Sequence, residues 1–255
     1  MLKMDAFFCS RIDDLCARAD RGELACSVFY NESEARAARD HLDSIRREGV
    51  LFFGGYEDAE RTRLFVFPYW LEPDVSETAE YISPVLIRGS GYAKLDHRSY
   101  LGALTSAGLS RDVIGDIVVQ DEISAVVFLD SKIAEYLTSP MPPLERIGRD
   151  KVKITPYTLP FGFSSGTEYI GISGTVASPR LDCVVSELTN ASREKTKEMI
   201  SQGLVSHNYA QVQNFSADVR EGDIISVRGY GKFRVESITE KTKKDRLRLM
   251  AVKYK

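Results

Sequence analysis

The middle of the chain constrains the fold most, because short apolar runs and helical patterns alternate there in a fixed order. The apolar runs are typical of strands and lie at residues 85–87, 117–119, 125–128 and 152–154. An amphipathic pattern at residues 100–108 follows the first run, and a shorter one at 132–137 follows the third. The predicted order is β-α-β-β-α-β.

This order predicts a ferredoxin-like middle domain over residues 76–160. RNA-recognition motifs share the topology and stack bases on aromatic side chains of the central strands. Here Phe128 is the only aromatic residue on the predicted central strands. The segment is therefore not expected to stack bases in that way, and the alternatives of binding protein or spacing its neighbours stay open.

The N-terminal residues 1–75 predict a separate α+β domain. Helical spacing predicts helices over residues 4–49, carried by Leu15, Ala19, Ala35, Ala38 and Leu42. A helix is expected to begin near Asn31, because acidic residues follow in its first turn. Apolar runs at residues 50–53 and 63–67 flank Gly54-Gly55 and predict an antiparallel hairpin.

Two short helices and a small sheet are predicted for residues 178–255, after a Gly-, Ser- and Pro-rich linker at 161–177 that has room for a short strand around Tyr169-Ile170. One apolar helix face is formed by Leu181, Val184, Val185 and Leu188. Ser192 is the predicted N-cap of the second helix, which ends at Gly203. The alternating residues 246–253 predict an edge strand, and 241–244 predict a hairpin tip.

The two parts of the chain differ in charge. Residues 172–255 contain 15 Lys and Arg against 10 Asp and Glu, whereas residues 1–171 contain 19 against 27. The whole chain has a net charge of −3. A basic end on an acidic body favours phosphate binding by that end alone.

The C-terminal part resembles the RNA-binding domain named after ribosomal small-subunit protein S-four. The matching elements are Arg180-Leu181-Asp182, Ser192-Arg193, residues 203–205, Asn208 and residues 221–229. The continuation at 229–233 (Gly-Tyr-Gly-Lys-Phe) is similar to the YlmH family of bacterial RNA-binding proteins. Residues 52–61, 97–104, 108–111 and 114–117 resemble the same family, although Ser99 and Ser110 stand where an acidic and a basic residue are expected.

The resemblance implies an S-four-type helix-loop-helix and contact with ribosomal RNA or tRNA. It further implies work on stalled large ribosomal subunits in ribosome-associated quality control. The candidate RNA-binding residues are Arg180, Asp182, Ser192, Arg193, Lys197, Gln202, Asn208, Arg228 and Lys232. Asp182 is expected to brace an arginine, and turn chemistry is the alternative for Gln202 and Asn208. A possible second RNA surface comprises His97, Arg98 and Arg111, with ordinary cap and surface roles as the alternative.

Other functions are weighed against RNA binding. Pseudouridine synthases share Arg-Leu-Asp, but their catalytic domain follows the small domain, and nothing comparable follows here. A methyltransferase needs a glycine-rich turn that opens a helix, and the segment 88–92 opens no helical pattern. No catalytic residue is predicted. A scaffold for cell division stays an alternative, which the salt dependence of RNA binding discriminates.

No metal or cofactor is expected. Cys9, Cys16, Cys26 and Cys183 form no CxxC pair, and the three histidines are far apart in sequence. The chain has neither an apolar run long enough for a membrane span nor a secretory leader pattern. We therefore expect a cytoplasmic monomer with no membrane partner and no small-molecule substrate.

Overall fold

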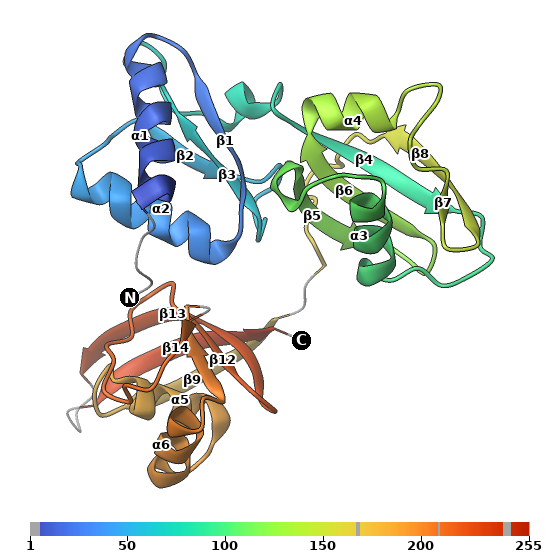
Figure 1. Ribbon diagram of the computed structural model, residues 1–255. Coiled ribbons are helices and arrows are strands. Elements are labelled where there is room, and N and C mark those ends of the chain that lie inside the picture. Colours follow the sequence, from blue (N-terminus) through green and yellow to red (C-terminus); the bar gives the residue numbers. More distant parts are fainter. Residues whose placement is uncertain (1–5, 167–168, 209, 242–245, 255) are drawn as a thin grey trace. The chain divides into compact units, whose positions relative to one another are not determined.

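Three antiparallel sheets and six α-helices make up the described residues of the computed structural model, 6–166, 169–208, 210–241 and 246–254 (Figure 1). The chain divides into two compact units, residues 4–166 and residues 167–255, which are described separately. Among the described residues, no helix is both long and apolar enough to cross a membrane.

The first sheet has the order β1-β3-β2, with β1 at Ala25–Tyr30, β2 at Val50–Phe53 and β3 at Thr62–Val66. Helices α1 (Ala6–Asp20) and α2 (Glu32–Ser44) pack against it. The predicted hairpin is confirmed by the antiparallel pairing of β2 with β3. Helix α2 begins at the predicted cap, where Asn31 and Glu34 form a reciprocal capping box.

The prediction of helix throughout residues 4–49 is wrong at β1. This segment contains Val28, Phe29 and Tyr30, which favour strands, and it pairs with β3 in antiparallel register. Because β3 pairs with both β1 and β2, it is the central strand of the sheet. Strand β1 is short, and its apolar and polar residues do not alternate strictly. The helical periodicity on both sides therefore led to a prediction of helix across it.

The second sheet has the order β5-β6-β4-β8-β7, and all neighbouring strands are antiparallel. The element order confirms the predicted β-α-β-β-α-β arrangement, with the short β7 and two 3-10 helices in addition. Their bounds are η1 Val75–Thr78, β4 Ile82–Gly89, α3 His97–Ser106, η2 Arg111–Val113, β5 Ile114–Val119, β6 Ser124–Asp130, α4 Ser131–Leu137, β7 Arg146–Ile147 and β8 Asp150–Pro156.

Both faces of this second sheet are buried. Val85, Ile87 and Val127 belong to a core shared with α3 and α4. Side chains of the opposite face, including Val126 and the fully buried Phe128, belong to a core shared with the first sheet. The face on which RNA-recognition motifs stack bases is therefore inside this unit.

The backbone of the loop between β2 and β3 packs closely on the Phe128 ring at Gly55. A Cβ atom on Gly55 would lie 2.4 Å from Cδ1 of Phe128, and Gly55 has φ +104°. Only glycine adopts such a backbone readily and leaves room for the ring. Tyr56 follows and packs on Phe128 with ring centroids 4.8 Å apart.

Asp116 of β5 fastens the loop between β2 and β3 to the second sheet. Its carboxylate accepts hydrogen bonds from the Tyr56 hydroxyl at 2.7 Å and from the backbone amides of Glu60 and Arg61 at 2.8 and 3.0 Å. Arg61 in turn donates to the carbonyl oxygens of Ile114 and Arg111. Three of the segments that resemble the YlmH family, residues 52–61, 108–111 and 114–117, are thus joined by hydrogen bonds.

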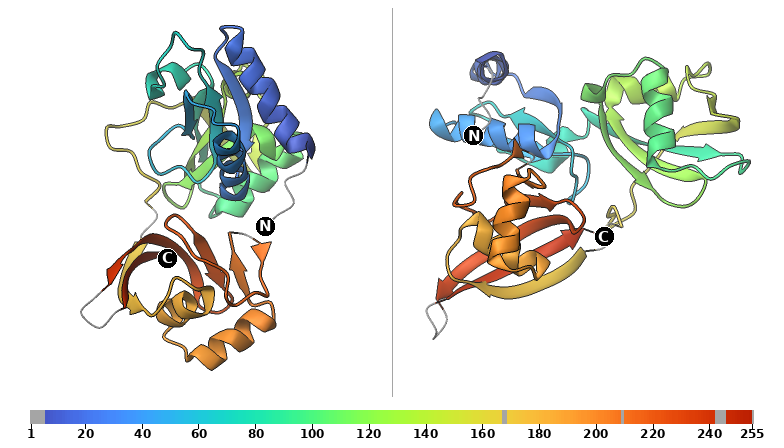
Figure 2. Two further views of the ribbon diagram at one scale, coloured as in Figure 1. Left: turned by 90° about the vertical axis from the view of Figure 1, so that its left-hand side faces the viewer. Right: turned by 60° about the horizontal axis from the view of Figure 1, so that its bottom comes forward.

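The C-terminal unit contains a six-stranded sheet with the order β11-β10-β12-β13-β14-β9. Figure 2 shows this sheet curved, with the two helices packed at its side. The apolar faces of both helices join the sheet in one core. The bounds are β9 Tyr169–Val176, α5 Leu181–Thr189, α6 Arg193–Ser201, β10 Val205–His207, β11 Ala210–Gln211, β12 Ile224–Val227, β13 Gly231–Lys241 and β14 Leu247–Tyr254.

The structure corrects two predictions here. The segment 161–177 is not wholly a linker, because β9 pairs with β14 over eight residues. Strand β14 is consequently not at the edge, since it lies between β13 and β9. Its alternation arises because Leu249 and Ala251 enter the core. The predicted tip at 241–244 lies largely outside the described residues.

Candidate nucleic-acid interface

A buried carboxylate organises exposed cations at the start of α5. The side chain of Asp182 has no exposed surface, whereas those of Arg180 and Arg193 are 40% and 49% exposed. Asp182 accepts hydrogen bonds from Nε and Nη2 of Arg180 at 3.1 and 3.2 Å and from Nη2 of Arg193 at 2.8 Å. The predicted bracing of an arginine by Asp182 is confirmed.

Opposing effects act on the Asp182 carboxyl group. Burial by itself raises its pKa, but the hydrogen bond from Arg193 and the charges of Arg193 and Arg180 outweigh burial and lower the pKa below its ordinary value. The same hydrogen bond raises the pKa of Arg193. Asp182 is therefore ionised at neutral pH, and its two partners present their remaining N–H groups to solvent.

Phe215 joins this cluster from the loop between β11 and β12. The residue is 42% exposed, and the Arg180 guanidinium carbon and Lys197 Nζ lie 5.8 and 5.2 Å from its ring centroid. The carbonyl oxygens of Phe215 and Ala217 accept hydrogen bonds from the first amides of α5, at Asp182 and Leu181. The loop thus supplies the helix cap that the Arg180 side chain does not.

We call Arg180, Asp182, Arg193, Lys197 and Phe215 the Asp182 cluster. It brings together four of the predicted residues and adds one that sequence reasoning missed. An aromatic residue in the polar run Gln213-Asn214-Phe215-Ser216 was the available signal. Fixed guanidinium groups beside an exposed ring suit phosphate and base contacts.

Three other predicted residues have partners within the protein. Ser192 caps α6 by accepting from the Lys195 amide at 3.2 Å. Gln202 donates to Glu198 at 2.9 Å. Asn208, whose φ is +50°, donates to Asp223 and accepts from the Ile224 amide. Their amides and hydroxyl thus stabilise turns and helix ends, and RNA contact by them stays a prediction.

Arg228 and Lys232 form a different group. They line a groove of about 480 Å³ at the turn between β12 and β13, which Gly203 and Gln211 also line. Gly203 has φ +70°, as predicted for the residue that ends α6. These two cations therefore extend the basic surface of the C-terminal unit but are not among the Asp182 cluster.

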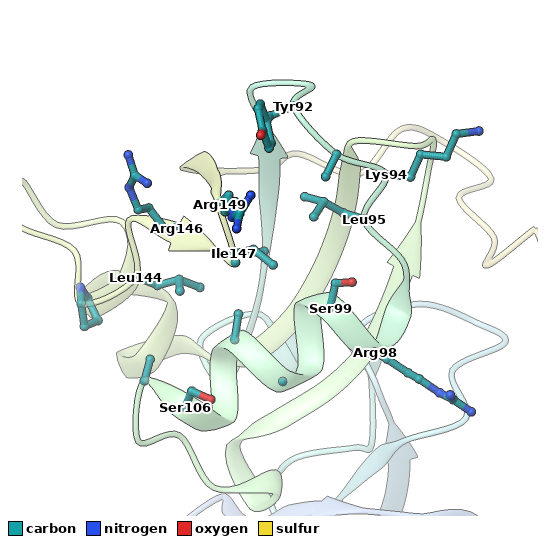
Figure 3. Close-up of a pocket in the computed structure, with 16 residues that line it drawn as sticks. Tyr92, Lys94, Leu95, Arg98, Ser99, Ser106, Leu144, Arg146, Ile147 and Arg149 are labelled. Atoms are coloured by element: carbon teal, nitrogen blue, oxygen red, sulfur yellow. The ribbon is translucent and has the colours of Figure 1, made fainter.

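The structure places the residues of the second predicted surface on two elements. His97 and Arg98 lie in the first turn of α3, whereas Arg111 begins η2, after the end of α3. RNA contact by these three residues stays a prediction. Arg98 also lines a groove of about 730 Å³ with the loop after β4 and the β7–β8 hairpin (Figure 3).

We call this cavity the hairpin groove. Sequence reasoning missed it, although the basic turn Arg146-Ile147-Gly148-Arg149 was visible. None of its lining residues is acidic. The lining side chains that carry charge or an exposed aromatic ring are Tyr92, Lys94, Arg98, Arg146 and Arg149.

No group of three or more His, Cys, Asp or Glu residues that suits a metal ion occurs among the residues that the structure describes. All four cysteines are free thiols. Burial raises the pKa of Cys26 to about 12, which keeps this thiol protonated at neutral pH.

Comparison with known proteins supports a nucleic-acid function. Residues 86–160 match a family model described as the putative RNA-binding domain in YlmH. This match covers the hairpin groove and nearly all of the second sheet, so it favours RNA binding over the other roles expected for this segment. Together with the cationic surfaces, it places the chain in the class of RNA-binding proteins.

The chain belongs to the YlmH family. It is 32% identical, over 79% of its length, to the ribosome-associated protein quality control protein P2 of Bacillus subtilis (strain 168), of which the match covers 76%. The solved structure of the cell division protein ylmH from Streptococcus pneumoniae is similar in fold, with a TM-score of 0.50 at 18% identity. That likeness covers 62% of this chain and 93% of the other.

Proposed function

We propose that the chain is a non-catalytic RNA-binding protein that docks on structured ribosomal RNA or tRNA of stalled large ribosomal subunits. It acts in the cytoplasm, as a monomer, in ribosome-associated quality control. The relative from Bacillus subtilis, a ribosome-associated protein quality control protein, supports this process. In this proposal the C-terminal unit is an S-four-type domain and the second sheet with α3 and α4 is a ferredoxin-like domain.

The Asp182 cluster is the observation that carries the proposal. A cation that contacts phosphate gains most when its geometry is fixed in advance, because less side-chain entropy is lost on binding. Asp182 fixes Arg180 and Arg193 while leaving both about half exposed. Such contacts position a protein on folded RNA without reading its base sequence.

The test is sedimentation of the tagged protein from a cell lysate through a sucrose gradient at low and moderate salt. The wild type is expected to migrate with large subunits, and the R180A/R193A/K197A variant to stay at the top. A matched control removes three other exposed cations of the same unit, in the variant K195A/R220A/R248A. This control is expected to migrate with the subunits.

Two outcomes contradict the proposal. If the wild type stays at the top at both salt concentrations, the ribosomal target is wrong. If the control variant loses association as fully as the cluster variant, general charge rather than the Asp182 cluster holds the RNA. Circular dichroism of both variants establishes that the fold is intact.

A further inference from the structure

The hairpin groove holds unneutralised positive charge in the middle of an acidic part of the chain. Arg146 and Arg149 are exposed, and neither has an ion-pair partner within the described residues. Lys94 pairs with Glu122, but both side chains are largely exposed, so that pair is weak. Isolated guanidinium groups around a cavity without acidic lining attract a polyanion.

The walls of the groove are fixed before any ligand binds. Asp150, which is fully buried, accepts hydrogen bonds from the amide of Ser90 at 2.9 Å and from that of Ala93 at 3.3 Å. The Ser90 hydroxyl hydrogen bond is the main cause that lowers the pKa of Asp150, so the carboxylate is charged at neutral pH. This bracing holds the loop that carries Tyr92 and Lys94 against the β7–β8 hairpin.

Tyr92 supplies an aromatic surface at the rim. The residue is 69% exposed, and Figure 3 shows its side chain on the loop after β4. Arg146 and Arg149 lie on the hairpin, whereas the Arg98 guanidinium points away from them along the other side. The cavity of about 730 Å³ is within the range of small-molecule sites, roughly 300–1,000 Å³, and has room for a nucleotide.

We propose that the hairpin groove binds a single-stranded RNA segment, with phosphates on Arg146 and Arg149 and an unpaired base stacked on Tyr92. Basic grooves with an aromatic platform hold single strands in this way. The inference rests on the proposed RNA-binding function and adds a second, separate site with a different RNA preference. It also explains how residues 86–160, which match an RNA-binding domain, bind RNA although the sheet face that carries Phe128 is buried.

The experiment measures binding of the full-length chain to two probes, purified large ribosomal subunits and a fluorescein-labelled 20-nucleotide poly(U) RNA, over a series of salt concentrations. The variants are R146A/R149A, Y92A and Y92F. The control K132A/K153A removes two exposed lysines of the same unit that do not line the groove. The cluster variant R180A/R193A/K197A is measured in parallel.

For poly(U), R146A/R149A is expected to weaken binding roughly tenfold and to reduce the slope of log Kd against log salt by about 1–2, since up to two phosphate contacts are lost. Y92A is expected to weaken binding about fivefold or more, and Y92F to retain it. The control and the cluster variant are expected to keep the affinity of the wild type.

The outcomes separate the two proposals. If no groove variant changes binding to either probe, or if poly(U) does not bind, the groove proposal is overturned while the Asp182 cluster can still hold subunits. If large subunits do not bind but poly(U) binds through the groove, the ribosomal proposal fails and the groove stands. If K132A/K153A weakens poly(U) binding as much as R146A/R149A does, the groove proposal is also overturned, because the charge of the unit alone then explains binding.

Discussion

At the scale of single residues, the C-terminal unit uses a buried acid to arrange exposed bases. Asp182 lies near expected phosphate contacts, where a negative charge is unfavourable unless it is fully compensated. Its two arginine partners provide that compensation. The resemblance to the S-four-type domain indicated Arg180, Asp182 and Arg193, and Lys197 lies four residues after Arg193 on the same helix. Phe215 is distant in sequence, so only the tertiary structure brings it there.

Asp182→Asn is expected to destabilise the C-terminal unit by roughly 1–3 kcal/mol at neutral pH, because hydrogen bonds to a charged group are lost. The folded-state pKa of Asp182 is lowered, so its contribution is complete above the unfolded value of about 3.9 and is lost as pH falls through the folded value. Urea unfolding between pH 3 and pH 7 measures this. The stability gap between wild type and variant should close at low pH.

Asp218→Asn is the control for that series, because Asp218 is mostly exposed and its contact with Arg220 is 3.5 Å long. It is expected to change stability by less than about 0.5 kcal/mol. A gap between wild type and Asp182→Asn that persists unchanged to pH 3 would show that the carboxylate charge is not what stabilises the unit.

Phe215→Ala is expected to lower the affinity for large ribosomal subunits by roughly 1–3 kcal/mol, since a base stacked on the exposed ring is lost. Phe215→Tyr should bind as the wild type does, because its ring keeps the stacking surface. Filter binding measures the affinities, and thermal melting checks the fold. Equal binding by Phe215→Ala and the wild type would exclude the ring from the interface.

At the scale of elements, local patterns predicted most strands and helices, and the misses have a physical cause. In strand β9, Gly171, Ser173 and Gly174 interrupt the strand-favouring residues, so the strand was expected only around Tyr169-Ile170, and its full length is defined by pairing with β14. Strand β1 is short and flanked by two helices. The hairpin groove needs three elements to meet, and no local pattern carries that information.

Phe128→Ala tests whether the second sheet face is core. Phe128 is fully buried between Tyr56 and Phe163, so its removal is expected to destabilise the first unit by roughly 3–5 kcal/mol. The folded variant should bind RNA as the wild type does. Val119→Ala, at a 39% exposed position of β5, is the control and should change stability by less than about 0.5 kcal/mol. A stable Phe128→Ala variant with weakened RNA binding would contradict the core assignment.

At the scale of the whole molecule, two cationic surfaces belong to two separately compact units. The sequence revealed this only in part, because the charge excess of residues 172–255 pointed to one basic end. The basic groove in the other unit is masked in any sum over residues 1–171, which are acidic overall. Net charge thus identified the first surface and concealed the second.

The unit boundary makes a prediction about fragments. A fragment of residues 167–255 is expected to unfold cooperatively and to bind RNA, whereas one of residues 178–255 lacks β9 and leaves one side of β14 unpaired. The shorter fragment should lose several kcal/mol of stability, because eight paired residues and the buried Val176 are removed. Circular dichroism melting compares them. Equal melting temperatures would mean that β9 is dispensable.

The pairing of β9 with β14 also has a kinetic consequence. Val176 pairs with Leu247, about seventy residues later in the chain, whereas the other contacts in this sheet join strands that are closer in sequence. Closing so long a loop lowers the entropy of the chain before the strand contacts stabilise it, and this slows folding. Refolding should therefore form the helix pair and the β12–β13–β14 meander first and add β9 last. Arg180 follows β9 by four residues, so this proposed phosphate contact reaches its final geometry only in that last step, after the Asp182–Arg193 pair has formed between the two helices.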